Sequence, residues 1–180
     1  MHANFESIES KYQELICSPE FSRLVEMIST NKKVYIIGNG GLHYVGSHMA
    51  TDLTRLVPHL VAKSFDSFGF ITSSANDHGW DNIFVNWLET SSILDDPDST
   101  FVYGMSCSGN STNVIKALDY ASSKLNFNTF LFCGRPNKSP LDCPVLCAHA
   151  DFYHTVETLG LMLFYEIIHR AGFACPNINR

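Results

Sequence analysis

Apolar residues near the start of the chain recur every three or four positions, which predicts helices. The pattern runs from Phe5 to Ser29 and is interrupted at Ser18-Pro19-Glu20. Because proline is well placed in a first helical turn, we expect two helices here rather than one. Four further helical patterns follow, at Tyr44–Leu56, Asp81–Leu94, Asn113–Leu125 and Tyr153–Ala171. The last is so apolar that it predicts burial against a sheet or against another subunit.

Short runs of apolar and β-branched residues alternate with these helices. The runs are Val34–Gly38, Leu60–Phe65, Phe101–Ser106, Thr129–Cys133 and Val145–Ala148. Because they are apolar on both faces, they are typical of strands covered above and below, as in a parallel sheet. The alternation predicts a doubly wound α/β fold with a five-stranded, mainly parallel sheet. Nothing resembling a linker interrupts the chain, so residues 1–180 are expected to form one domain. Residues 1–31 would form helices packed on the core or on another subunit.

The composition is that of an ordinary globular protein. Of 180 residues, 45% are hydrophobic and 17% are charged, and the formal net charge is −6. The negative charge argues against nucleic acid as a direct partner, because backbone phosphates require a basic surface. No apolar stretch is long enough to span a membrane, and the N-terminus has no signal-peptide pattern. The six cysteines include no C-x-x-C pair, so a reducing cytoplasm is expected.

Three polar segments that contain glycine, residues 38–41, 73–79 and 106–112, are expected at strand ends. Open α/β sheets bind ligands beyond the carboxyl ends of their strands, where helix N-termini present free N–H groups. In the third segment, S-C-S-G-N-S-T, hydroxyls surround Gly109 and precede a predicted helix. This segment can bind a phosphate without a P-loop lysine, so no nucleotide cofactor is expected. The alternative is a plain turn in which Ser111 or Thr112 caps the helix.

Two predicted helices carry further candidate chemistry. His48 and Asp52 are four residues apart on one helix face, so both can point at a metal or at a substrate hydroxyl. The alternative is an ordinary pair of surface neighbours. Glu157 follows His154 by three residues in a very apolar helix, where a buried carboxylate needs a partner. The alternative for Glu157 is a first-turn acid that complements the helix dipole.

Three motifs together resemble the sugar isomerase (SIS) domain family, and most closely its phosphoheptose isomerase branch. They are G-N-G-G-L-H-Y-V-G-S-H-M-A-T-D-L from Gly38, A-N-D-H-G-W-D-N-I-F from Ala75 and S-C-S-G-N-S-T-N-V-I-K-A-L from Ser106. The resemblance runs from about Val34 to the last helix. It implies a three-layer α/β/α domain and a homotetramer with active sites at subunit borders. It also implies isomerisation of sedoheptulose 7-phosphate for surface polysaccharide.

The resemblance assigns roles to particular positions. Phosphate binding falls on Ser106, Cys107, Ser108 and Ser111, with Cys107 replacing the usual threonine by a weaker thiol donor. The sugar site falls on Asn39, Gly40, Gly41, Asn76 and Asp77. His48 matches a metal-binding histidine, and Asp52 matches the catalytic glutamate, shortened by one methylene. His48, Asp52 and Glu157 would then hold a divalent ion such as Zn²⁺.

Several positions depart from the family pattern. Glu157 stands for a glutamine, and Tyr165 stands for the second acid/base histidine. Leu42 replaces a serine, and His78 replaces an aromatic residue. With Asp52 as the base, the proton donor would be Tyr165, His78 or His154.

Two functions of different classes follow. The first is a metal-assisted phosphosugar isomerase, which His48, Asp52 and Glu157 favour. The second is a non-catalytic SIS module that binds a sugar phosphate or a protein in a regulatory role. Tyr165, Cys107 and Leu42 favour the second, because they remove groups that the isomerases use. Of the two, the sequence favours the enzyme.

Overall fold

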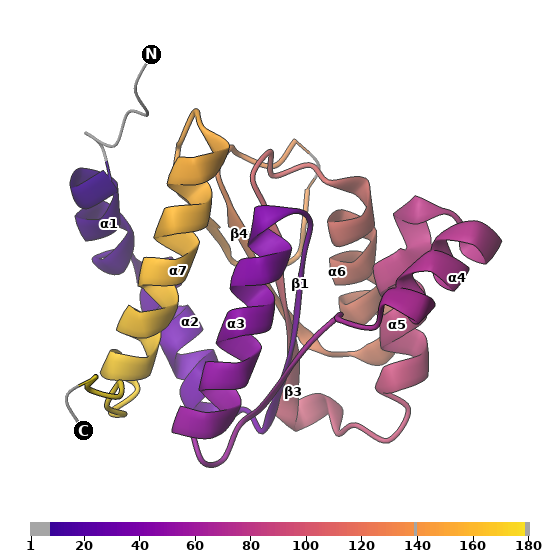
Figure 1. The fold of residues 1–180 in the computed structure, drawn as a ribbon, viewed down its shortest axis with the longest axis horizontal. Coiled ribbons are helices and arrows are strands. Elements are labelled where there is room, and N and C mark those ends of the chain that lie inside the picture. Colours follow the sequence, from indigo (N-terminus) through magenta and orange to yellow (C-terminus); the bar gives the residue numbers. More distant parts are fainter. Residues whose placement is uncertain (1–7, 139, 179–180) are drawn as a thin grey trace.

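The computed structural model describes residues 8–138 and 140–178, which form a sheet with helices on both faces (Figure 1). The strands are β1 (Lys33–Gly38), β2 (Val61–Ser64), β3 (Thr100–Ser106), β4 (Asn128–Cys133) and β5 (Val145–Cys147). Their spatial order is β2-β1-β3-β4-β5, and each neighbouring pair is parallel. The predicted α/β fold is therefore confirmed, and the sheet is parallel throughout.

The helices divide between the two faces of the sheet (Figure 1). One face carries α1 (Ile8–Ile16), α2 (Pro19–Thr30), α3 (Gly41–Leu56) and α7 (Tyr153–Arg170). The other carries α4 (Phe68–His78), α5 (Ile83–Ser91) and α6 (Thr112–Leu125), and the 3₁₀ turns are η1 (Trp80–Asn82) and η2 (Pro97–Ser99). No helix within the described ranges is long and apolar enough to cross a bilayer. Phe5, the first residue of the predicted helical pattern, lies outside the described residues.

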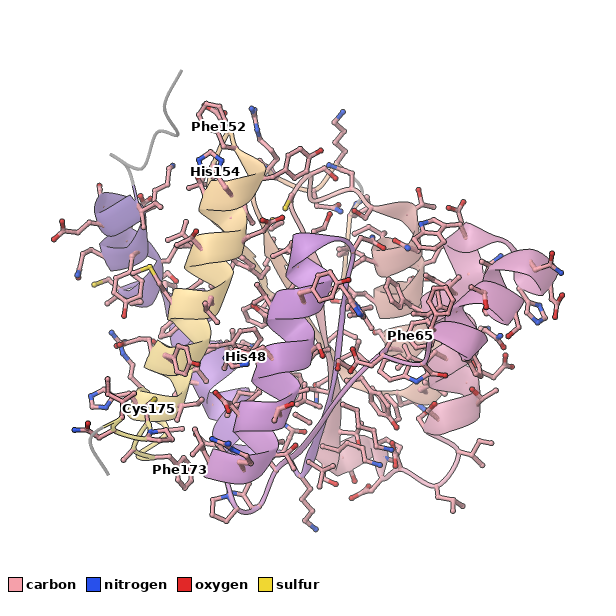
Figure 2. All side chains as sticks on the ribbon, viewed as in Figure 1. His48, Phe65, Phe152, His154, Phe173 and Cys175 are labelled. Atoms are coloured by element: carbon pink, nitrogen blue, oxygen red, sulfur yellow. The ribbon has the colours of Figure 1, made fainter. Side chains whose placement is uncertain are left out.

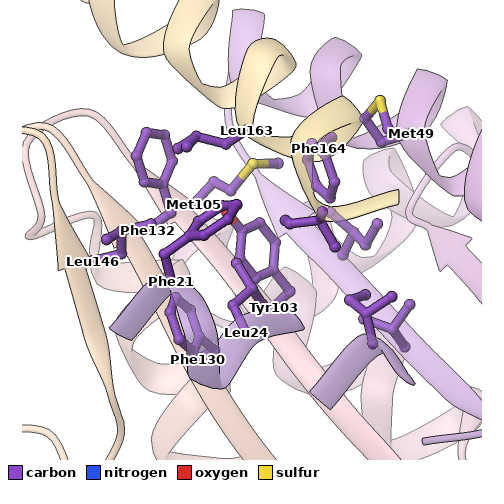
Figure 3. Close-up of a cluster of buried hydrophobic side chains, with 14 of the residues drawn as sticks. Phe21, Leu24, Met49, Tyr103, Met105, Phe130, Phe132, Leu146, Leu163 and Phe164 are labelled. Atoms are coloured by element: carbon purple, nitrogen blue, oxygen red, sulfur yellow. The ribbon is translucent and has the colours of Figure 1, made fainter. Parts of the chain in front are cut away.

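A large apolar cluster fills the space between the sheet and the helices on the face that carries α7 (Figure 3). The ring of Tyr103 stacks on Phe130 at 5.8 Å and meets Phe164 edge-on at 5.4 Å. Phe21 and Leu24 of α2 are buried in the same cluster. The first two helices therefore pack on the core through α7, because their apolar faces complete this layer.

The opposite face is built on Phe65, which follows β2. Its ring stacks on Trp87 at 5.0 Å and meets Phe70 edge-on at 5.6 Å. This packing explains one wrong prediction. Residues 73–79 were expected at a strand end, whereas residues 73–78 lie in α4, which begins after its N-cap Ser67. The helix forms because Phe70 and Ile71 anchor it to the core beside Phe65.

The order of the strands places a crevice between β1 and β3. These strands are neighbours, with Gly38 opposite Met105 at their carboxyl ends. The helix that follows β1 covers one face, and the helix that follows β3 covers the other (Figure 1). Such a point, where the connections diverge, is where open α/β sheets bind ligands.

Candidate functional site

A cavity of about 230 Å³ lies at this crevice. The turns after β1 and β3 line it, together with the start of α7. Its lining residues are Asn39, Gly40, Gly41, Leu42, Met105, Ser106, Cys107, Ser108, Ser111, Tyr153 and Glu157. Eight residues predicted to belong to the site therefore share one cavity, although they come from three separate segments of the chain.

The turn after β3 gathers hydroxyls at the positive end of α6. Ser106 Oγ lies 2.9 Å from Ser111 Oγ and 3.4 Å from Ser108 Oγ, and it accepts a hydrogen bond from the Ser111 amide at 3.3 Å. The N-cap residue, Ser111, makes no side-chain cap to α6. Gly109 permits the turn because its φ is +70°, a backbone region that favours glycine. The result is a concave set of donors at a helix N-terminus, which suits a phosphate.

A second loop, residues 134–138, holds this turn in place. Gly134 N donates to Ser106 O at 3.2 Å, and Asn137 Nδ2 donates to Gly109 O at 2.6 Å. Lys138 N donates to Asn110 Oδ1 at 2.9 Å. Asn110 Nδ2 also donates to Pro136 O at 3.5 Å. These hydrogen bonds hold the two loops together and preorganise the turn.

Two amides tie the turn after β1 to α6. Asn39 Nδ2 donates to Asn113 Oδ1, and Asn113 Nδ2 donates to Asn39 Oδ1, both at 2.9 Å. Asn113 is buried, and its Oδ1 also accepts from the Val114 amide at 2.9 Å. Asn39 thus lines the cavity from a fixed position, although the sequence alone suggested only a role toward the ligand.

Glu157 points from α7 to the first turn of α3. A Cβ atom added to Gly41 would lie 2.2 Å from Glu157 Oε1, so the carboxylate occupies the space that a side chain at position 41 would need. The N-cap of α3, Gly40, supplies no side chain to the helix end. The carboxylate therefore lies beside the positive end of α3, where negative charge is favourable.

Cys107 belongs to the hydroxyl-rich turn and lines the cavity together with Glu157. Burial raises the pKa of the Cys107 thiol to about 11, and the charge of Glu157 adds to the effect. The side chain is therefore a neutral thiol at ordinary pH and can donate only a weak hydrogen bond.

Three predicted site residues, His48, Asp52 and Tyr165, meet between α3 and α7 and do not line the cavity. Figure 2 shows His48 on the side of α3 that faces α7. His48 Nε2 lies 2.9 Å from the Tyr165 hydroxyl and 3.7 Å from Asp52 Oδ2. Tyr165 donates to Asp52 Oδ2 at 3.2 Å, and an Arg55 nitrogen lies 3.4 Å from Asp52 Oδ1. Burial raises the pKa of Tyr165, and the charge and hydrogen bond of Asp52 raise it further, so the phenol keeps its proton.

The three predicted metal ligands are not brought together. His48 and Asp52 are neighbours, whereas Glu157 lies at Gly41, roughly 10 Å from His48 along α3 at 1.5 Å per residue. Within residues 8–138 and 140–178, no three His, Cys, Asp or Glu side chains are arranged to hold a metal ion. His48, Asp52 and Glu157 as arranged in the single chain therefore do not form the shared metal site that the resemblance implies.

The second motif contributes to the crevice in a way that differs from the prediction. Asn76, Asp77 and His78 are exposed on the last turn of α4, and Asn76 Nδ2 donates to Asp77 Oδ1 at 2.8 Å. They line neither this cavity nor its neighbours. Trp80 of the same motif lines an aromatic cavity of about 210 Å³, which borders Asn39 and Gly40 from the other side. Within this motif, Trp80 is therefore a residue that lies beside the crevice, whereas Asn76, Asp77 and His78 do not.

Two residues at the site were not predicted. Arg135 and Tyr153 line a smaller cavity of about 170 Å³, which shares Cys107 and Ser108 with the first. Arg135 pairs with Asp151 at 2.6 Å. The sequence did contain a clue to Arg135, because this residue follows the predicted fourth strand by two positions and so lies at the same edge of the sheet as the cavity. His154, a predicted proton donor, stacks on Phe152 at the start of α7 (Figure 2).

Known proteins are similar to this chain in sequence and in fold. The phosphoheptose isomerase of Hamiltonella defensa subsp. Acyrthosiphon pisum (strain 5AT) is 31% identical over 152 residues, which cover 81% of this chain and 71% of that protein. The structure of the phosphoheptose isomerase GmhA from Neisseria gonorrhoeae matches with a TM-score of 0.79 at 20% identity, covering 91% of this chain and 90% of that one. The Vibrio vulnificus NanR protein in complex with ManNAc-6P matches with a TM-score of 0.62 at 19% identity, covering 92% of this chain and 59% of that one.

No protein-family model matches the chain. The identity to the Hamiltonella protein nevertheless extends over more than two thirds of both sequences. The fold agrees, with a parallel sheet, two preceding helices and a hydroxyl-rich turn after β3. This chain is therefore a SIS-domain protein that belongs to the phosphoheptose isomerase family.

Proposed function

We propose that the protein isomerises a phosphorylated sugar between its aldose and ketose forms, with sedoheptulose 7-phosphate as the substrate and surface polysaccharide as the destination. The hydroxyl-lined turn from Ser106 to Ser111 carries this proposal, because it offers a dianion several donors at the N-terminus of α6. The related proteins support the same class of ligand, since phosphoheptose isomerases act on a sugar phosphate and the Vibrio vulnificus NanR structure is a complex with ManNAc-6P.

The proposed roles follow from the positions of the side chains. Ser106, Ser108 and Ser111 bind the phosphate. Because Asp52 lies away from this cavity in the single chain, Asp52 would act on the sugar across a subunit border, as the family resemblance implies. The Asp52 carboxylate removes a proton from the carbon beside the carbonyl and returns it to the neighbouring carbon. Tyr165 keeps its proton and donates a hydrogen bond to Asp52 in the unliganded protein. With substrate bound, this hydroxyl turns to donate a hydrogen bond to the oxygen that gains negative charge as the enediolate forms.

Two features remain predictions from the family resemblance. The first is a bound divalent ion such as Zn²⁺, which elemental analysis of the purified protein tests directly. The second is a homotetramer with active sites at subunit borders, which light scattering tests. His48 is exposed in the isolated chain, so a neighbouring subunit has room to approach this part of α3.

The experiment is hydrogen exchange during isomerisation. Purified protein is incubated with sedoheptulose 7-phosphate in D₂O, with and without added divalent ions, and the C1 and C2 hydrogens are followed by NMR. We expect exchange, and we expect Asp52→Asn to stop it. Asp119→Asn is the matched control, because Asp119 is exposed on α6 and belongs to neither cavity.

A second function is favoured by one observation. Tyr165 occupies the place of the family's acid/base histidine and contacts both His48 and Asp52. Such a chain would bind a sugar phosphate without converting it and would serve a regulatory role. Binding of sedoheptulose 7-phosphate without any exchange, under every metal condition, would establish this function in place of the enzyme.

A further inference from the structure

The charged side chains of the 230 Å³ cavity do not favour the binding of a dianion. Its eleven lining residues include one carboxylate, Glu157, and no lysine or arginine. A sugar phosphate that enters therefore meets a like charge and neutral donors only. A cation from outside the cavity would offset this repulsion.

Arg135 is a cation that lines the adjoining cavity of about 170 Å³, and Cys107, Ser108 and Tyr153 line both cavities. Its backbone is fixed against the phosphate turn, because a Cβ at Gly109 would lie 2.2 Å from the Arg135 carbonyl oxygen. The base of the side chain is therefore held in place, while its guanidinium group is free to change partners.

The present partner of Arg135 is weakly held. Its guanidinium lies 2.6 Å from Asp151 Oδ1, but the two side chains are 58% and 72% exposed. Ion pairs so exposed contribute little to stability, because water and salt screen them. A phosphate offers the guanidinium a doubly charged acceptor and two parallel hydrogen bonds, which are stronger.

From these observations we infer that Arg135 releases Asp151 when a sugar phosphate binds and becomes the cationic ligand of the phosphate. Asp151 acts as a competitor that holds the guanidinium in the unliganded protein. The inference rests on the proposed function, since it names a further binding residue of the same site.

Titration calorimetry with sedoheptulose 7-phosphate tests the exchange, because the two members of the pair are expected to act in opposite directions. Arg135→Gln should weaken binding about tenfold, since one charge-assisted contact is lost. Asp151→Asn should tighten binding about threefold, since the guanidinium no longer has a competitor. Arg135→Lys should lie between wild type and Arg135→Gln, and Lys124→Gln, at the far end of α6, should change nothing. If the ion pair between Arg135 and Asp151 had a purely structural role, both Arg135→Gln and Asp151→Asn would weaken sugar-phosphate binding.

The double variant Arg135→Gln/Asp151→Asn separates partner exchange from simple repulsion by Asp151. If Asp151 acts through Arg135, the gain from Asp151→Asn disappears in the Arg135→Gln background. A gain that persists there overturns the inference. Unchanged affinity in both single variants, while Ser111→Ala weakens binding, also overturns it and leaves the proposed function standing. Failure of the wild-type protein to bind any sugar phosphate would instead overturn the proposed function.

Discussion

The Tyr165 hydroxyl lies 2.9 Å from Nε2 of His48 and joins α7 to α3 two turns beyond Glu157. The same oxygen donates to Asp52 at 3.2 Å. One phenol therefore connects the two residues that the family resemblance marks as metal ligand and base. In the proposed isomerase, this phenol takes the place of the family's histidine as a hydrogen-bond donor.

Removal of the hydroxyl tests the enzyme proposal. Tyr165→Phe should lower kcat for isomerisation by about 100-fold, the usual cost of a lost acid or base, with little change in KM. Tyr120→Phe is the control, since Tyr120 lies on α6 away from this cluster. Steady-state kinetics on sedoheptulose 7-phosphate provide the measurement. A full rate in Tyr165→Phe would remove the tyrosine from the mechanism.

The phosphate turn should not tolerate a side chain at Gly109. Its φ is +70°, and an added Cβ would lie 2.2 Å from a backbone oxygen that cannot move easily. Gly109→Ala should therefore cost about 2 kcal/mol of stability and abolish sugar-phosphate binding. Gly69→Ala is the matched control, because nothing lies within 4 Å of a Cβ there and alanine favours a helix. Urea unfolding measures the stability of the two variants, and calorimetry measures their binding of sugar phosphate. Equal stability and equal binding in the two variants would contradict the role assigned to Gly109.

Cys107 should react slowly with alkylating reagents. Its thiol pKa of about 11 leaves little thiolate at pH 8, whereas Cys17 is exposed. Glu157→Gln removes the second cause of the raised pKa, so labelling of Cys107 by iodoacetamide at pH 8 should become about threefold faster. Glu26→Gln, on α2, should leave the rate unchanged. Mass spectrometry of labelled peptides gives the alkylation rate of Cys107 in each variant. An unchanged rate in Glu157→Gln would mean that the carboxylate of Glu157 does not act on the Cys107 thiol.

The attachment of α1 to α7 should depend on pH. Tyr12 donates to Glu166 Oε2 at 2.9 Å, and Arg170 Nε donates to Glu166 Oε1 at 2.7 Å. Burial raises the pKa of Glu166, but these hydrogen bonds outweigh it, and the net shift is downward from 4.5. A lowered pKa in the folded state gives stability that is present above pH 4.5 and is lost as the pH falls through the folded value.

The corresponding variant is Glu166→Gln. It should be less stable than wild type by about 1 kcal/mol at pH 7, and the difference should shrink as the pH falls below about 4.5. Glu14→Gln, exposed on α1, should show no such trend. Urea unfolding at several pH values gives the comparison. A difference that stays constant with pH would mean that the charge of Glu166 does not matter.

The sequence by itself determined the order of the five strands and of the described α-helices other than α4, and it located the hydroxyl-rich turn from Ser106 to Ser111. Both depend on local pattern, because hydrophobic period and a glycine among hydroxyls act over a few neighbouring residues. In a parallel sheet the carboxyl ends of strands meet at one edge, so Asn39 and Ser106 could be expected in the same crevice before any coordinates were known.

Only the tertiary structure decided which distant side chains meet. Packing of α7 on α3 places Glu157 at Gly41 and Tyr165 at His48, and no local pattern specifies the relative position of two helices. The same holds for Arg135, whose place beside Gly109 depends on how two loops from separate strands fit together. It also holds for α4, which forms because Phe65 gives Phe70 a surface to pack on. These contacts depend on the three-dimensional fit of surfaces far apart in the chain, which a one-dimensional pattern does not contain.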